Sequence, residues 1–172
     1  MPGAPARFVK YHDEPALLVA EKAGLHILEN YLPVPRVEAL QRVAPGALLV
    51  MDYHRVQSLR ASAQWRRAGQ ALGLLHGQHA ESYGADSDNF IGAMPQLNAW
   101  CDSWPDFFAR FRLLPQCDFA RKNGLPAPLC EQVLWVAGQL ERWLPARPPA
   151  SLLHGDLWRG NLGWSEGAPF FL

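Results

Sequence analysis

The sequence predicts an α+β fold in two lobes, a small mixed lobe at residues 1–55 and a mainly helical lobe at residues 56–172. Three observations lead to this prediction. A strand-like run, a helical pattern and a second strand-like run follow one another near the start of the chain, which is the layout of a small mixed lobe. Beyond them, apolar residues recur every three or four positions over long stretches. Two short strand-like runs joined by a turn come last.

The elements expected in the first lobe come in a simple order. Residues 7–11 read as a strand, and the apolar residues between positions 17 and 31 suit an amphipathic helix that Pro33 and Pro35 end. A connector is expected after these prolines. The apolar run at residues 47–51 then reads as a buried strand.

The second lobe is expected to hold helices around residues 62–80, from Ser103 onward and over residues 129–144. Ser103 suits the N-cap of the middle helix, because Pro105 and Asp106 favour a first helical turn. Its aromatic residues have a helical period, and we expect them in the core more than at a ligand site. Residues 162–164 and 169–172 should be two strands joined by a turn at residues 165–167.

Composition excludes several classes of function. Sixteen basic and sixteen acidic residues give a net charge of zero, which argues against nucleic acid or an anionic membrane surface as a partner. No apolar run reaches the roughly 18 residues of a membrane span, and the start of the chain lacks the pattern of a signal peptide. Cys101, Cys117 and Cys130 are odd in number and widely spaced, which favours reduced thiols and a cytoplasmic location.

The most informative motif runs from Leu152 to Asn161. His154, Asp156 and Asn161 have the spacing of the catalytic loop in kinase-fold phosphotransferases. There an Asp accepts the proton of the attacking hydroxyl and an Asn offers an oxygen to Mg²⁺. We expect His154 to brace the loop by hydrogen bonding to nearby backbone. The alternative is a polar loop in which Asp156 caps a turn and Asn161 tolerates a left-handed backbone.

Residues near the start of the chain supply partners for this loop. Lys10 follows a strand-like run and Glu21 falls in the next helix, an order that suits a Lys on nucleotide phosphates with an acidic partner. Met51, Asp52 and Tyr53 would form the hinge between lobes, whose backbone could bind adenine. The alternatives are a solvated Lys, an exposed helix Glu and an ordinary strand end.

Over nearly its whole length the sequence resembles the fructosamine kinases (ketosamine-3-kinases), a branch of the aminoglycoside and choline kinase-like phosphotransferases. Two features separate this family from other kinase-like folds, the Asn-Phe-Ile-Gly segment and the Trp inside the catalytic loop. The segments that carry the resemblance are Phe8-Val9-Lys10, residues 20–25, Leu74-Leu75-His76, residues 88–92, Asn98-Ala99-Trp100 with Trp104, Phe107 and Phe108, residues 112–116 and residues 154–161.

The resemblance implies an incomplete protein-kinase-like two-lobe fold and a deglycation repair activity. ATP, with Mg²⁺, would phosphorylate the O3 hydroxyl of a ketosamine, on a small glycated amine or a protein lysine. Asp156 would be the base, Asn161 a metal ligand, Lys10 the phosphate contact with Glu21 as its partner, and Trp158 a wall for the sugar. In this family an Asp-Pro follows the last strand, and two strands with a phosphate-covering loop precede the lysine. We therefore expect a chain truncated at both ends, poorly stable alone and weakly active or inactive.

Two other functions stay open at this point. A related kinase of choline, an aminoglycoside or another sugar would use the same catalytic loop. A non-catalytic, degenerate member is favoured only by the two incomplete ends. The sequence does not indicate an oligomeric state.

Overall fold

The computed structural model describes residues 5–172 and divides into two compact units. The first unit combines the chain up to Gln78 with the final segment Leu152–Leu172, and the second is His79–Ser151. Both helices and strands are present, so the α+β prediction is confirmed. No helix in residues 5–172 has the length and apolar character needed to cross a membrane.

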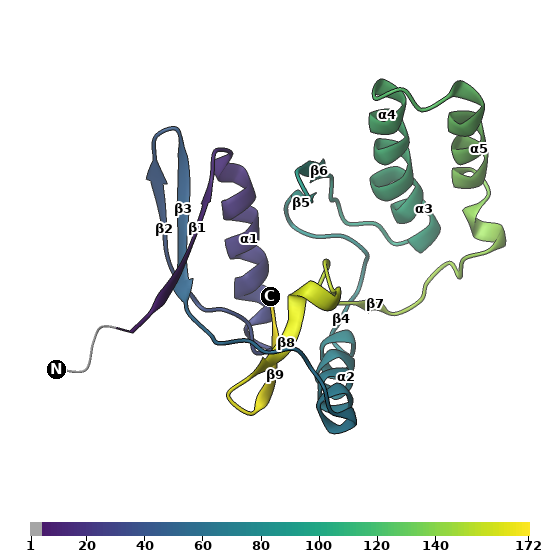
Figure 1. Cartoon of the computed structure of the whole chain (residues 1–172). Helices are drawn as coiled ribbons and strands as arrows, with labels where there is room; N and C mark the ends of the chain where they lie inside the picture. The colour runs from purple at the N-terminus through teal and green to yellow at the C-terminus, as the bar shows by residue number, and fades with distance from the viewer. Residues whose placement is uncertain (1–4) are drawn as a thin grey trace. The chain divides into compact units, whose positions relative to one another are not determined.

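A three-stranded antiparallel sheet and one helix begin the first unit (Figure 1). The strands are β1 (Arg7–His12), β2 (Val37–Val43) and β3 (Gly46–Asp52), with β3 in the centre. Helix α1 (Pro15–Leu28) packs on the sheet. The expected helix is confirmed, but it ends before Tyr31. Strand β2 replaces the expected connector, because β3 supplies a pairing edge along its length.

Helix α2 (Ser62–His76) and a hairpin complete the first unit. The hairpin consists of β8 (Leu162–Ser165) and β9 (Ala168–Phe171). The turn between them is confirmed, since Glu166 and Gly167 have φ of 50° and 82°, as a two-residue hairpin turn requires. Helix α2 stops before the expected residue 80, because Gly77 caps it and His79 joins a strand.

The core of the first unit joins residues that are far apart in the sequence. Leu18 of α1, Leu49 of β3, Leu75 of α2 and Phe171 of β9 are all fully buried in one cluster. The hairpin is also tied to the segment after β3, since Gln57 and Trp164 exchange two main-chain hydrogen bonds of 3.0 and 2.7 Å. For this reason residues 152–172 belong to the same compact unit as the N-terminal sheet. The predicted lobe boundary at residue 55 does not coincide with this division, and the division into functional lobes stays a prediction.

The second unit is mainly helical. It contains α3 (Trp104–Phe108), a π-helical turn (Ala109–Leu113), α4 (Leu114–Lys122), α5 (Ala127–Ala137) and a short 3₁₀ turn (Leu140–Arg142). Two short strand pairs accompany these helices: β4 (His79–Ala80) pairs with β7 (Ala150–Ser151), and β5 (Asn89–Ile91) pairs with β6 (Met94–Gln96).

Local signals explain where the helices of the second unit begin and end. Ser103 Oγ accepts a hydrogen bond from the main chain of Asp106 at 3.3 Å, so the predicted N-cap is confirmed. The expected aromatic packing is present too, with the ring centroids of Trp104 and Phe107 5.8 Å apart. The expected helix at 129–144 is interrupted at Gly138, which caps α5.

Candidate active site

All the residues that the sequence analysis singled out for catalysis or nucleotide binding lie in the first compact unit. They fall in three places: on the neighbouring elements β1 and α1, at the end of β3, and in the loop between β7 and β8. The loop follows Leu152 and ends in a 3₁₀ turn, Arg159–Asn161, which leads directly into β8. Gly155 has a φ of 89°, which a side chain would disfavour, so the glycine permits the sharp bend before Asp156.

Asp156 and Asn161 are brought together by this loop. Asn161 Nδ2 donates one hydrogen bond to the main-chain oxygen of Asp156 at 2.9 Å and a second to Asp156 Oδ2 at 2.8 Å. These bonds fix the Asn161 amide and leave Asp156 Oδ1 and Asn161 Oδ1 free of hydrogen bonds within the described chain. Asp156 is exposed, so its free carboxylate oxygen is accessible to a ligand. The pair therefore presents one proton acceptor and one neutral oxygen ligand side by side.

The predicted hydrogen bonding of His154 is wrong. Both ring nitrogens are inaccessible to solvent and neither has a hydrogen-bond partner in the described chain. The ring lies instead against Phe171, with 6.1 Å between the ring centroids. This burial lowers the pKa of His154 below its ordinary value, although the nearby Asp156 charge acts in the opposite direction. His154 therefore supports the loop by packing.

Trp158 lies in the same loop, with 62% of its surface exposed. Its ring lies over Gly160, where the Cβ of any other residue would come within 2.5 Å of the ring carbons. Glycine at position 160 therefore allows the indole to lie flat against the loop. A flat, exposed indole is a suitable stacking surface for a sugar ring or another planar ligand. Trp158 and Gly160 both belong to the loop motif in the sequence, but their close contact is a property of the folded loop.

Lys10 and Glu21 form an ion pair between β1 and α1. Lys10 Nζ lies 2.6 Å from Glu21 Oε2, and the side chains are 46% and 30% exposed. The structure thus brings these two predicted partners together. An exposed pair of this kind adds little to stability, on the order of 0–1 kcal/mol. It does hold the ammonium group in one position at the surface of the sheet.

The three expected hinge residues differ in which of their groups are free to bind a nucleotide. Met51 is buried in the core, and the main-chain N–H of Asp52 donates to the carbonyl of Arg36 at 3.1 Å. The Asp52 side chain is also occupied, by the main-chain N–H of Arg36 at 2.7 Å and by His54 at 3.2 Å. Tyr53 lies beyond the strand, and its main chain makes no hydrogen bond to the rest of the described chain. Of the three expected hinge residues, Tyr53 is therefore the one whose backbone is free to bind a ligand.

The donor set in the loop fits Mg²⁺ as a partial site. Residues 5–172 contain no group of three or more His, Cys, Asp or Glu side chains that could hold a metal ion. Asn161 Oδ1 is a hard oxygen ligand held in a fixed direction by the two bonds of its amide nitrogen. Mg²⁺ is commonly bound by one or two protein oxygens together with waters and substrate phosphates. Asn161 can therefore serve as one ligand to an ion that arrives with a nucleotide.

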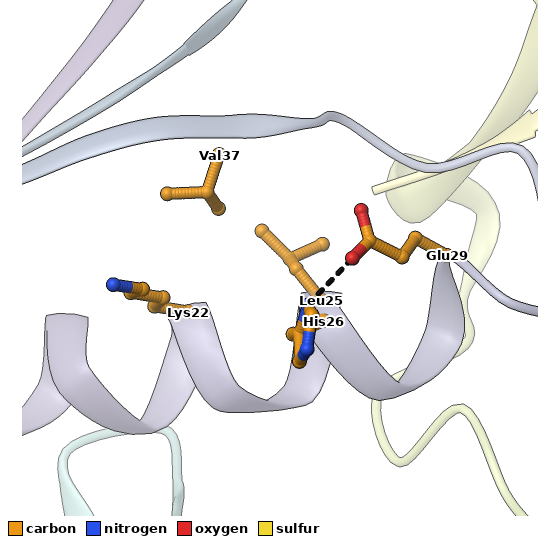
Figure 2. Close-up of a pocket in the computed structure, with 5 residues that line it drawn as sticks. All are labelled: Lys22, Leu25, His26, Glu29 and Val37. Atoms are coloured by element: carbon orange, nitrogen blue, oxygen red, sulfur yellow. Dashed lines mark hydrogen bonds and ion pairs between the residues drawn. The ribbon is translucent and has the colours of Figure 1, made fainter.

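A small pocket elsewhere in the first unit contains none of these residues. It lies between α1 and β2 and is lined by Lys22, Leu25, His26, Glu29 and Val37 (Figure 2). His26 Nδ1 and Glu29 Oε1 lie 2.6 Å apart at one side of it. The pocket carries no part of the Asp156 loop, so it is not the candidate active site.

Comparison with known proteins gives the same family by three routes. The family model described as fructosamine kinase matches residues 4–172. A relative in Escherichia coli K12, named "Probable ketoamine kinase YniA", is 32% identical over 168 residues, covering 95% of this chain and 58% of the relative. A crystal structure of a "putative fructosamine-3-kinase" from Thermobifida fusca has a TM-score of 0.81 at 31% identity, covering 96% of this chain and 59% of that one.

A second crystal structure supports the fold. The "putative fructosamine-3-kinase" from Haemophilus somnus superposes with a TM-score of 0.85 at 23% identity, over 97% of this chain and 57% of that one. The fold is therefore kinase-like, as the family resemblance implied. The chain spans a little under three fifths of the length of the relatives it matches.

Proposed function

Because the chain belongs to the fructosamine kinase family, we propose that it takes part in the ATP-dependent phosphorylation of ketosamines. The substrate would be a sugar hydroxyl of a fructosamine or ribulosamine adduct, on a small glycated amine or a protein lysine. Phosphorylation at O3 and the loss of the sugar that follows would make this a deglycation repair activity. The names of the relatives support the kinase class and the ketoamine substrate class.

The observation that carries the proposal is the paired geometry of Asp156 and Asn161. In the proposed reaction a sugar hydroxyl oxygen attacks the γ-phosphorus of ATP, and the bond from that phosphorus to ADP breaks. The Asp156 carboxylate accepts the hydroxyl proton. Asn161 keeps the carboxylate in position through the bond from its Nδ2 to Asp156 Oδ2. Phosphoryl transfer requires mainly positioning and charge neutralisation, which fixed polar groups of this kind supply.

The remaining residues would bind and orient the two substrates. Lys10 Nζ, held by Glu21, would contact the phosphates, and the free backbone of Tyr53 would bind the adenine edge. Trp158 would stack on the sugar. Mg²⁺, held in part by Asn161 Oδ1, would neutralise the phosphate charge when bound. A cytoplasmic location, favoured by the cysteine pattern, stays a prediction.

The test is phosphoryl transfer from ATP to fructosyl-lysine by the chain with Mg²⁺, comparing the wild type with Asp156→Asn. In a catalytically intact version of the protein we expect turnover to fall by roughly 10²–10⁴ in the variant, the usual contribution of a positioned general base, with little change in nucleotide affinity. Glu131→Gln is the matched control, because Glu131 is exposed on α5 and makes no ion pair in the described chain.

Three outcomes would count against the proposal. Unchanged turnover in Asp156→Asn would show that Asp156 is not the base. Faster phosphorylation of choline, an aminoglycoside or a free sugar than of fructosyl-lysine would identify a related small-molecule kinase. Binding of MgATP without transfer to any of these acceptors would identify a non-catalytic member.

A further inference from the structure

A polar cluster in the second unit takes no part in the proposed reaction. It joins the β5–β6 hairpin to the π-helical turn Ala109–Leu113. Asn89 Oδ1 accepts from Gln96 Nε2 at 3.0 Å and from Asn98 Nδ2 at 3.1 Å. Asn98 Oδ1 in turn accepts from Arg112 Nη2 at 2.7 Å. The cluster therefore links Arg112 to the hairpin through a continuous set of hydrogen bonds.

The guanidinium of Arg112 is held rigidly by neutral groups. Nη1 donates to the main-chain oxygens of Leu97 and Phe111, each at 2.8 Å. The ring of Phe107 lies below the guanidinium, 4.6 Å from its central carbon. A π-turn places side chains differently from a regular helix and is often found at functional sites. Here the turn directs Arg112 toward the segment that follows the hairpin.

Arg112 retains N–H groups that form no hydrogen bond in the described chain. A guanidinium has five N–H hydrogens, and three are used in the bonds to Leu97, Phe111 and Asn98. Nε makes no hydrogen bond in the described chain. It is not among the fully buried polar atoms that lack a partner there, so part of its surface reaches solvent. Arg112 thus has two N–H groups, Nε–H and one on Nη2, that form no hydrogen bond within the described chain.

The positive charge of Arg112 has no direct counter-ion. Within residues 5–172 it forms no ion pair with a carboxylate. Burial lowers the pKa of Arg112 below its ordinary value, which reflects the cost of holding the charge there. Binding of an anion would recover part of that cost.

We propose that Arg112 is the centre of a carboxylate-binding site on the second unit, for a small organic acid. The proposal does not depend on the kinase activity. A planar guanidinium matches a carboxylate in shape and can bind it with two hydrogen bonds. A dianionic phosphate fits less well, because the carboxylates of Asp86 and Asp88 lie on the adjacent segment, bonded to Trp100 Nε1 and to the main chain of Asn98.

The test follows the Nε–H resonance of Arg112 by ¹H–¹⁵N NMR while sodium acetate is added to the ¹⁵N-labelled chain. We expect a saturable shift with acetate that neither sodium chloride at equal ionic strength nor neutral acetamide produces. Arg110 is the internal control, because it lies in the same turn, is exposed and makes no hydrogen bond in the described chain. Two charge-assisted hydrogen bonds correspond to a Kd in roughly the millimolar range. No saturable shift up to about 100 mM acetate, or the same shift in Arg110 or with chloride, would therefore overturn the proposal.

A variant provides a second measurement. Arg112→Lys assigns the resonance by removing it and keeps the charge without the planar fork. The side-chain amide signals of Asn98 then report acetate binding in both proteins. We expect acetate affinity to fall about tenfold or more in the variant. Equal acetate affinity in the variant would contradict the role of the guanidinium. If the variant loses the hairpin signals, the titration of the wild type still tests the proposal.

Discussion

Replacing Phe171 by alanine should destabilise the first unit strongly. Phe171 is fully buried among Leu18, Leu49 and Leu75, although it lies in the last strand of the chain. Truncation of a buried phenylalanine costs about 3–5 kcal/mol, as lost transfer free energy plus the cavity that remains. With a urea m-value of about 2 kcal/mol/M, this corresponds to a midpoint lowered by roughly 1.5–2.5 M.

Urea denaturation followed by circular dichroism measures this loss. The matched control is Phe8→Ala, because Phe8 is a phenylalanine of the same unit but is 51% exposed, so its truncation should cost about 1 kcal/mol or less. Phe171→Leu should fall between the two, which keeps the comparison usable if the alanine variant does not fold. A Phe171→Ala midpoint equal to that of Phe8→Ala would refute the assignment of Phe171 to a shared core.

The same substitution makes a separate prediction for His154. The His154 ring lies against Phe171, and burial is the main cause of its lowered pKa. Removing the phenyl ring admits water, so the pKa of His154 should rise toward its ordinary value of about 6.5. An imidazole titration by NMR, on the Phe171→Leu variant if necessary, measures the shift. An unchanged pKa would show that other groups bury this histidine.

Three further predictions concern the loop and the ion pair. Lys10→Met should weaken MgATP binding by about tenfold or more, measured by calorimetry. Loss of the exposed ion pair with Glu21 should change the free energy of unfolding by less than about 1 kcal/mol. The pKa of His154 is lower in the folded state than in the unfolded chain, so on acidification the unfolded chain protonates this histidine at a higher pH. Stability should therefore fall as the pH drops below about 6.5. The loss of stability between pH 7.5 and 5.5, measured as the change in urea midpoint, should be smaller in His154→Gln than in the wild type. Equal losses in the two proteins would refute this role of His154. Gly160→Ala should displace the Trp158 ring, changing its fluorescence and lowering sugar affinity but not MgATP affinity; unaltered sugar affinity would remove Trp158 from the sugar site.

Local patterns were enough to predict much of the fold. Helix α1, strand β3 and the final hairpin follow from apolar spacing and turn residues, because each depends on neighbours in the sequence. The N-cap at Ser103 is local in the same sense. Strand β2 was missed because its exposed, mixed sequence becomes a strand only by pairing with β3.

The candidate site, like the fold, was predicted only in part from the sequence. The residues themselves were recognisable from the spacing of His154, Asp156 and Asn161, since a catalytic loop needs those groups at those intervals. The ion pair of Lys10 with Glu21 was also expected, and the structure contains it. The role of His154 was not predictable, because its packing against Phe171 depends on a strand that reaches the loop only after folding.

The sequence by itself determined most helical and strand periods, the residues of the candidate catalytic loop and the family to which the chain belongs, because these are properties of short segments. Only the tertiary structure decided that the last strand shares a core with α1, β3 and α2, and that Asp52 is occupied by Arg36 and His54 while Tyr53 keeps its backbone free. The physical reason is that burial and hydrogen-bond partners depend on contacts between distant segments, which no local pattern specifies.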